Sequence, residues 1–109
     1  MTSSTLATET ATAKDVKVNH DALIVELRDG RKVSVPLTWY PRLAAGRPAE
    51  RRNWQFIGRG MGIHWPDLNE DISIEGLLLG RRSGESTASL QRWRATRRRL
   101  ANKRMEPTR

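Results

Sequence analysis

The alternation of apolar and polar residues predicts a small antiparallel sheet in the first third of the chain. Val16 and Val18 alternate with polar neighbours, which is the period of two that a half-buried strand requires. Two further runs, 22–28 and 32–35, are rich in β-branched and aliphatic residues and are separated by Asp29-Gly30. An Asp-Gly pair between two such runs favours a type I′ hairpin turn, because that turn needs a positive φ angle at both central residues. The pattern therefore predicts three consecutive strands.

Short helices are predicted after the third strand. Pro36 ends this strand, because proline cannot donate a hydrogen bond to the ladder. Residues 39–45 read as a helix that Thr38 caps and a left-handed Gly46 stops. A second helical piece over 49–52 is expected to follow Pro48.

A second hairpin and a last short helix complete the patterned region. Residues 54–57 and 63–65 read as strands, and the glycine-rich segment between them reads as their turn. Ser73 is a suitable N-cap for a helix over 74–79, with Gly80 as its terminator. The order β-β-β-α-β-β-α predicts an α+β fold with a small antiparallel sheet and short helices on one face.

Composition divides the chain into three parts. Residues 1–13 are rich in Thr, Ser and Ala and are expected to be disordered, and residues 14–82 form the expected α+β domain. Residues 83–109 form a basic tail that can be helical over 88–103, with Leu90, Trp93 and Leu100 on one stripe. A domain of this size buries only about 60% of its unfolded surface, so dimerisation or docking on a partner would stabilise it.

The excess positive charge of +8 lies entirely in the tail. Residues 1–80 contain ten basic and ten acidic side chains, whereas residues 81–109 contain ten basic side chains against Glu85 and Glu106. The start of the chain lacks the basic and apolar stretches of a secretory signal, and the longest apolar run is Leu77-Leu78-Leu79. We therefore expect a cytoplasmic protein without a membrane segment.

The second hairpin carries a more specific pattern. Gly62-Ile63-His64-Trp65-Pro66 is followed by Asp71-Ile72-Ser73, and the segments Asp29-Gly30-Arg31, Val35-Pro36-Leu37 and Trp39-Tyr40-Pro41-Arg42-Leu43 precede it. This pattern resembles a bacterial family catalogued as domain of unknown function 2442, over roughly residues 16–86.

The resemblance implies a small α+β fold, no established activity and a bacterial or phage-like source. Some members of this family are encoded beside small partner proteins, in arrangements that look like toxin–antitoxin pairs. Others carry a helix-turn-helix domain after this module, but residues 87–109 are too few for a multi-helix DNA reader. The basic tail departs from the family pattern, so the resemblance implies nothing about it.

The candidate chemical motifs favour structural roles. Gly58, Gly60 and Gly62 lack the spacing of a dinucleotide fingerprint and lie between two strands, so they indicate a hairpin turn. His64 precedes four carboxylates, Asp67, Glu70, Asp71 and Glu75. With His64, these residues can bind a metal ion or act in acid–base catalysis. Alternatively, the carboxylates form turns and cap the last helix. The other histidine is His20, and the chain has no cysteine and no nucleophile-elbow serine. We therefore predict no enzyme, cofactor, metal site or small-molecule substrate.

Two sets of residues are candidate binding surfaces. Aromatic residues are enriched in binding hot spots, although in a small domain they can equally be core residues. The candidate partner-binding face comprises Trp39, Tyr40, Arg42, Trp54, His64 and Trp65. The candidate nucleic-acid-binding residues are Arg92, Trp93, Arg94, Arg97, Arg98, Arg99, Lys103 and Arg104.

These surfaces lead to two main hypotheses. The first is a non-enzymatic protein-interaction module of a small bacterial two-protein system, antitoxin-like, which binds a small partner protein or a second copy of itself. The alternative is a nucleic-acid-binding protein that uses the arginine-rich tail, with the domain as a dimerising scaffold. The tail can also be a solvated, disordered segment or bind an acidic protein or anionic lipid. A hydrolase or transferase using His64 with Asp67 or Asp71 is the remote third hypothesis.

Overall fold

The computed structural model describes residues 11–105, with side chains placed up to residue 101. The disorder expected over residues 1–13 falls mostly on residues 1–10, which lie outside the described residues. Ala13 is an ordered part of the fold, because it begins the first strand and its side chain is fully buried.

The first three strands form one antiparallel sheet in the order β1-β2-β3. They are β1 (Ala13–Val18), β2 (Ala22–Leu27) and β3 (Lys32–Pro36). The predicted hairpin between β2 and β3 is confirmed, with Leu23 opposite Val35. Gly30 has a φ of +96° in its turn, but Asp29 does not have a positive φ, so the predicted type I′ turn is wrong. The Asp29 side chain accepts a hydrogen bond from the Arg31 amide at 3.0 Å, which holds the turn.

A second antiparallel sheet has the order β4-β5-β6 and contains one strand that the pattern did not predict. Its strands are β4 (Gln55–Ile57), β5 (Gly62–Trp65) and β6 (Glu70–Ser73). The predicted glycine-rich turn between β4 and β5 is confirmed, because Gly58 and Gly60 have positive φ angles.

The extra strand, β6, arises because the chain turns earlier than its carboxylates suggested. Asn69 adopts a φ of +50°, which asparagine tolerates well, and its amide donates to the Pro66 carbonyl. The turn thus ends before Glu70, and the next four residues pair with β5.

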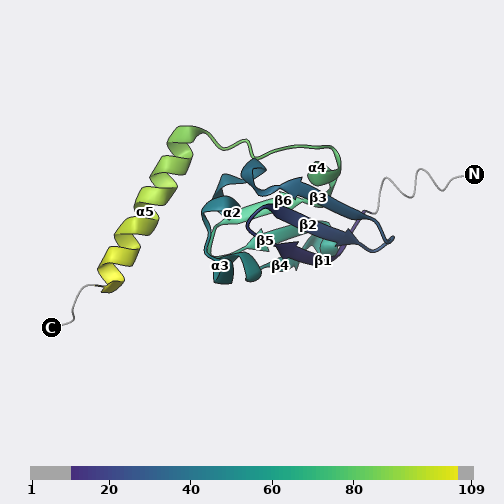
Figure 1. The fold of residues 1–109 in the computed structure, drawn as a ribbon, viewed down its shortest axis with the longest axis horizontal. Helices are drawn as coiled ribbons and strands as arrows, with labels where there is room; N and C mark the ends of the chain where they lie inside the picture. Colours follow the sequence, from purple (N-terminus) through teal and green to yellow (C-terminus); the bar gives the residue numbers. More distant parts are fainter. Residues whose placement is uncertain (1–10, 106–109) are drawn as a thin grey trace, which may run out of the picture.

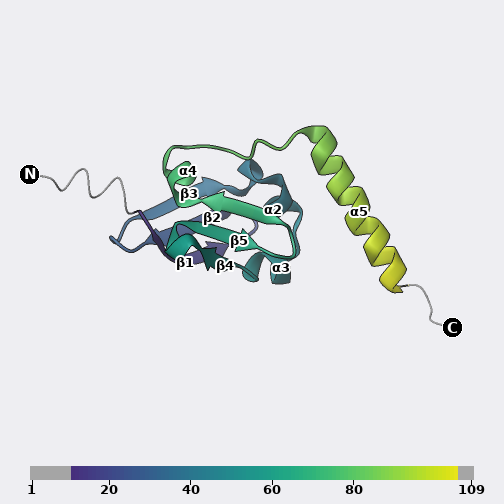
Figure 2. The same ribbon diagram turned by 180° about the vertical axis from the view of Figure 1, so that it is seen from behind.

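The two sheets lie against each other around one core (Figure 1 and, from behind, Figure 2). Leu23, Val25 and Leu27 of β2 belong to the same buried cluster as Ile63 and Trp65 of β5. The α+β class and the approximate order of elements are confirmed. The arrangement differs from one sheet with helices on one face, because two three-stranded sheets enclose the core.

The helical region after β3 is interrupted at Tyr40, where one continuous helix over 39–45 was predicted. A 3-10 helix (Leu37–Trp39) is followed by α2 (Pro41–Ala45) and α3 (Pro48–Arg52). Tyr40 lies outside the helical region, with φ −129° and ψ 87°, because the helical conformation is disfavoured for a residue that precedes a proline. A new helix therefore begins at Pro41, and Thr38 is no cap.

The two predicted helix-ending glycines behave differently. Gly80 has a φ of +75° just after α4 (Ile74–Leu78), as predicted. Gly46 is extended, with a φ of −76°, so the left-handed stop predicted there is wrong. Its glycine is explained by close packing, since a Cβ atom at this position would lie 2.8 Å from Leu68.

The last helix, α5 (Thr87–Met105), lies beyond the end of the sheets at which α2 and α3 are placed (Figures 1 and 2). It has 19 residues, and the Ser86 hydroxyl accepts a hydrogen bond from the Ser89 amide at its start. Among the described residues, no helix is both long and apolar enough to cross a membrane.

Candidate nucleic-acid interface

The segment between α4 and α5 is held against the domain by hydrogen bonds and a cation–π contact. The Tyr40 hydroxyl donates to the Arg81 carbonyl at 2.8 Å, and the Ser83 amide donates to the Trp39 carbonyl at 3.0 Å. The Arg82 guanidinium lies 4.6 Å from the centre of the Trp39 ring, within cation–π range. These contacts fix the direction in which the chain enters α5.

Arg42 and Glu85 form a bidentate ion pair just before α5. The Arg42 Nε and Nη2 atoms lie 2.9 and 2.6 Å from the Glu85 carboxylate, and Arg42 also donates to the Asn69 carbonyl at 3.0 Å. The two side chains are only 16% and 10% exposed. The hydrogen bond from Arg42 lowers the pKa of Glu85, and the same bond raises the pKa of Arg42. The pair therefore remains ionised near neutral pH and joins the segment between α4 and α5 to α2.

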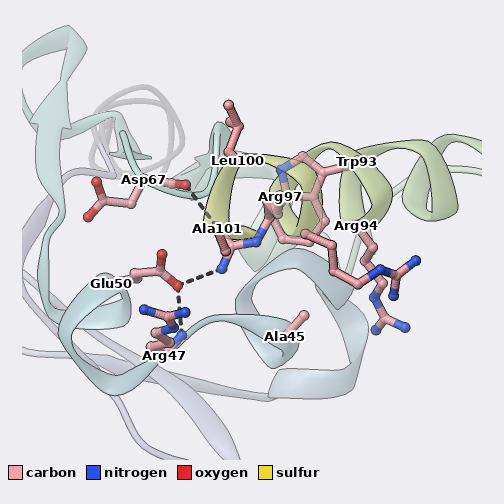
Figure 3. Close-up of a pocket in the computed structure, with 10 residues that line it drawn as sticks. Ala45, Arg47, Glu50, Asp67, Trp93, Arg94, Arg97, Leu100 and Ala101 are labelled. Carbon is pink, nitrogen blue, oxygen red and sulfur yellow. Dashed lines mark hydrogen bonds and ion pairs between the residues drawn. The ribbon is translucent and has the colours of Figure 1, made fainter. Parts of the chain in front are cut away.

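Trp93 anchors the first half of α5. Its ring lies 4.8 Å from the Arg97 guanidinium (Figure 3) and 5.0 Å from that of Arg42. The side chain is half-buried against the core. Cation–π contacts of this kind each contribute roughly 0.5–2 kcal/mol, more when water is excluded. Trp93 is thus occupied by contacts within the chain.

Arg97 connects the middle of α5 to α3. Its Nη2 atom lies 2.8 Å from Glu50 Oε1, and its Nη1 atom donates to the Asp67 carbonyl at 3.3 Å (Figure 3). Burial raises the pKa of Glu50, but the hydrogen bonds from Arg97 and the Arg47 amide outweigh it and hold this pKa below its usual value. The positive charge of Arg97 is therefore paired with the Glu50 carboxylate of the domain.

The other arginines of α5 with described side chains are exposed. They are Arg92, Arg94, Arg98 and Arg99. Arg94 and Arg98 also line a groove of about 440 Å³ between α5 and the domain, on whose opposite side Arg47 lies beside Glu50 (Figure 3). Lys103 and Arg104 belong to α5, but their side chains lie outside the described residues.

The predicted partner-binding face is not one surface. Trp65 is fully buried and donates through Nε1 to the Arg51 carbonyl at 3.0 Å, and Tyr40 is only 4% exposed. Including these two residues was wrong, because a core of this size needs their large side chains. Trp39 and Trp54 are half-buried, and Trp54 lies against Phe56 with 4.9 Å between ring centres. Arg42 is engaged by Glu85 rather than presented to solvent.

The carboxylates near His64 are separated. His64 pairs with Asp71 across β5 and β6, while Asp67 accepts a hydrogen bond from the Asn53 side chain at 2.9 Å. In the part of the chain with placed side chains, no group of three His, Cys, Asp or Glu residues is positioned to hold a metal ion.

The pKa of Glu70, at the start of β6, is raised well above its ordinary value. Burial, together with the nearby carboxylates of Glu85 and Asp71, raises the pKa of Glu70 to about 7, although the Arg42 charge opposes the change. Burial of the Tyr40 hydroxyl raises its pKa, and the nearby charge of Glu70 raises it further. A charge on Glu70 at neutral pH thus costs the folded state free energy.

Sequence reasoning missed the two acidic residues that hold α5, Glu85 and Glu50. Glu85 stands in a small polar stretch that reads as a linker, and Glu50 lies in a short helix more than forty positions from its partner Arg97. A signal was present for Trp93, since it shares the apolar stripe of α5 with Leu90.

Comparison with known proteins establishes the fold and the family. No significant match is found among curated proteins. A crystal structure of a protein of unknown function from Rhodospirillum rubrum matches with a TM-score of 0.61 and 23% identity, over 73% of this chain and 96% of that chain. A solution NMR structure of an uncharacterized protein from Chromobacterium violaceum matches with a TM-score of 0.61 and 22% identity, over 84% of each chain. At these identities the two structures show the fold alone. The sequence profile described as "Protein of unknown function (DUF2442)" matches residues 13–83, and the chain therefore belongs to this family, as its resemblance indicated.

Proposed function

We propose that this protein binds nucleic acid through the phosphate backbone, using the exposed arginines of α5. The proposal rests on one observation: the side chains on one side of this helix contact the domain, and the arginines on the other side are exposed. Trp93 and Arg97 face the domain and are held by Arg42 and Glu50, whereas Arg92, Arg94, Arg98 and Arg99 remain exposed. In this proposal the family domain acts as a non-enzymatic scaffold that presents α5 in the cytoplasm.

The charge of α5 favours a polyanionic partner. The helix has seven basic and no acidic residues, and Arg94 and Arg98 are four positions apart on one face. Like charges at this spacing destabilise a helix by roughly 0.2–0.5 kcal/mol per pair, so these arginine side chains repel one another and weaken the helix. Phosphates placed beside these side chains would relieve the repulsion and release condensed counterions, which is the main driving force of non-specific binding.

An acidic protein fits the exposed face of α5 less well. Protein interfaces are built around apolar and aromatic anchors, with charges at the rim. The aromatic residue of α5, Trp93, is occupied by Arg42 and Arg97, and the exposed face presents mainly arginines with Ala88, Gln91 and Thr96 between them. Such a surface offers charge and hydrogen bonds without an apolar centre.

A protein-interaction role, as in an antitoxin-like pair, is supported by a different segment. Ile57 is 40% and Met61 is 53% exposed on either side of the turn between β4 and β5. An apolar surface of this kind suits a small partner protein or a second copy. Co-expression with the product of the neighbouring gene tests this role, and the absence of any stable complex would exclude it.

The nucleic-acid proposal is tested by the salt dependence of binding. With four phosphate contacts, the affinity for a fluorescently labelled 20-base-pair DNA should fall about 100-fold between roughly 50 and 200 mM salt. Fluorescence anisotropy with the full chain measures both affinities. No binding at the lower salt concentration, or an affinity that salt leaves unchanged, would contradict the proposal.

A further inference from the structure

The side of α5 turned away from the domain has a narrow uncharged ridge. Ala88, Gln91 and Ala95 follow one another at spacings of three and four residues, so they lie along one line of the helix surface. Ala88 and Gln91 are exposed, and the small Ala95 side chain is partly exposed between arginines. The contacts of Trp93 and Arg97 with the domain place this ridge on the outer side of α5.

A row of arginines flanks the ridge on each side. Arg92 and Arg99 come four positions after Ala88 and Ala95, which places both on one flank. Arg94 and Arg98 come three positions after Gln91 and Ala95, which places both on the other flank. The two rows therefore point in different directions, with small or uncharged side chains between them.

We propose that α5 binds in the major groove of double-stranded DNA, with the ridge toward the base edges and one arginine row toward each phosphate strand. This inference rests on the proposed function and names its substrate. An α-helix with its side chains is about 10–12 Å across, and the major groove of B-DNA is about 12 Å wide. Small residues at the leading edge let the helix approach closely, and the flanking arginines meet the two backbones that border the groove.

The domain extends one of the two rows. Arg47 lies across the groove of about 440 Å³ from Arg94 (Figure 3), and Arg98 lines the same groove. The negative charge of Glu50 in that groove is balanced by Arg97. One phosphate strand therefore meets basic groups from both α5 and the domain. The strand beside Arg92 and Arg99 meets α5 alone.

The same geometry disfavours double-stranded RNA. The A-form major groove is deep and too narrow for side chains to read, so α5 could contact an RNA duplex only from outside. Purely electrostatic binding would treat both duplexes alike, whereas groove insertion requires the B-form.

The test compares DNA and RNA duplexes of the same sequence with the full chain and two variants. Ala95→Leu adds bulk to the ridge without changing charge, and leucine is nearly as good a helix former as alanine. Thr96→Leu places the same leucine side chain beyond the Arg92–Arg99 row, again without changing charge, and is the control for a leucine outside the ridge, with circular dichroism checking the helix. We expect the full chain to prefer DNA by about tenfold or more, Ala95→Leu to remove most of that preference, and Thr96→Leu to keep it.

Equal affinities for the two duplexes, or an Ala95→Leu variant that binds DNA as the unmodified chain does, would overturn the groove inference. Salt-dependent binding in either case would leave the proposed function standing. Absence of salt-dependent binding to any nucleic acid would overturn both.

Discussion

Replacing the four exposed arginines of α5 with glutamine is expected to lower the affinity for duplex DNA by on the order of 100-fold or more at moderate salt. The variant carries Arg92→Gln, Arg94→Gln, Arg98→Gln and Arg99→Gln. Its helix should stay docked, because Trp93 and Arg97 keep their contacts with Arg42 and Glu50. The salt slope should also become shallower by about four, because each phosphate contact contributes about one unit. Fluorescence anisotropy at several salt concentrations measures both quantities.

A variant with the same change in net charge separates local contact from general attraction. Lys17, Arg28, Lys32 and Arg52 are exposed basic residues of the domain, away from the outer face of α5. Replacing these four with glutamine should lower the affinity far less than the α5 replacements do. An equal loss in the two variants would show that net charge, rather than α5, determines binding.

The Glu70→Gln variant is expected to be more stable than the unmodified chain at pH 8, and no more stable at pH 5. Burial raises the pKa of Glu70 to about 7 in the folded state, above its ordinary value of 4.5. Between these pH values the folded protein holds a proton that the unfolded chain has lost, so stability falls as the pH rises through this window. Because the side chain is partly exposed, we expect a gain at pH 8 on the order of 2 kcal/mol after solvent screening.

Urea unfolding at pH 5 and pH 8 measures this difference as a shift in the transition midpoint. Glu75→Gln is the matched control, because Glu75 is exposed on α4, and its effect should be similar at the two pH values. A Glu70→Gln effect that is the same at pH 5 and pH 8 would contradict the burial of a titrating carboxyl beside Arg42 and Glu85.

Local patterns were sufficient for most of the fold. The Asp29-Gly30 turn, the glycine-rich turn after β4 and the Ser73 cap depend on conformational preferences of single residues. Their consequences are local, so they can be predicted without a three-dimensional structure. The strand β6 was missed because three polar residues, Glu70, Asp71 and Ser73, surround its one buried side chain, Ile72.

The candidate site was harder to predict because its contacts join distant segments. The exposed arginines of α5 are evident from charge alone, but the partners of Arg42 and Arg97 are 43 and 47 positions away. No periodicity connects such pairs. Aromatic residues posed the opposite problem, since composition does not distinguish the buried Trp65 from Trp93, which lies between two guanidinium groups.

The central claim, that nucleic acid binds to the outer face of α5, is tested most directly by NMR. A ¹⁵N-labelled full chain is titrated with an unlabelled 20-base-pair DNA, and amide shifts are followed residue by residue. We predict the largest changes over residues 88–99 of α5 and at Arg47, with small changes across β1, β2 and β3. Changes confined to the turn between β4 and β5, with none in α5, would contradict the account.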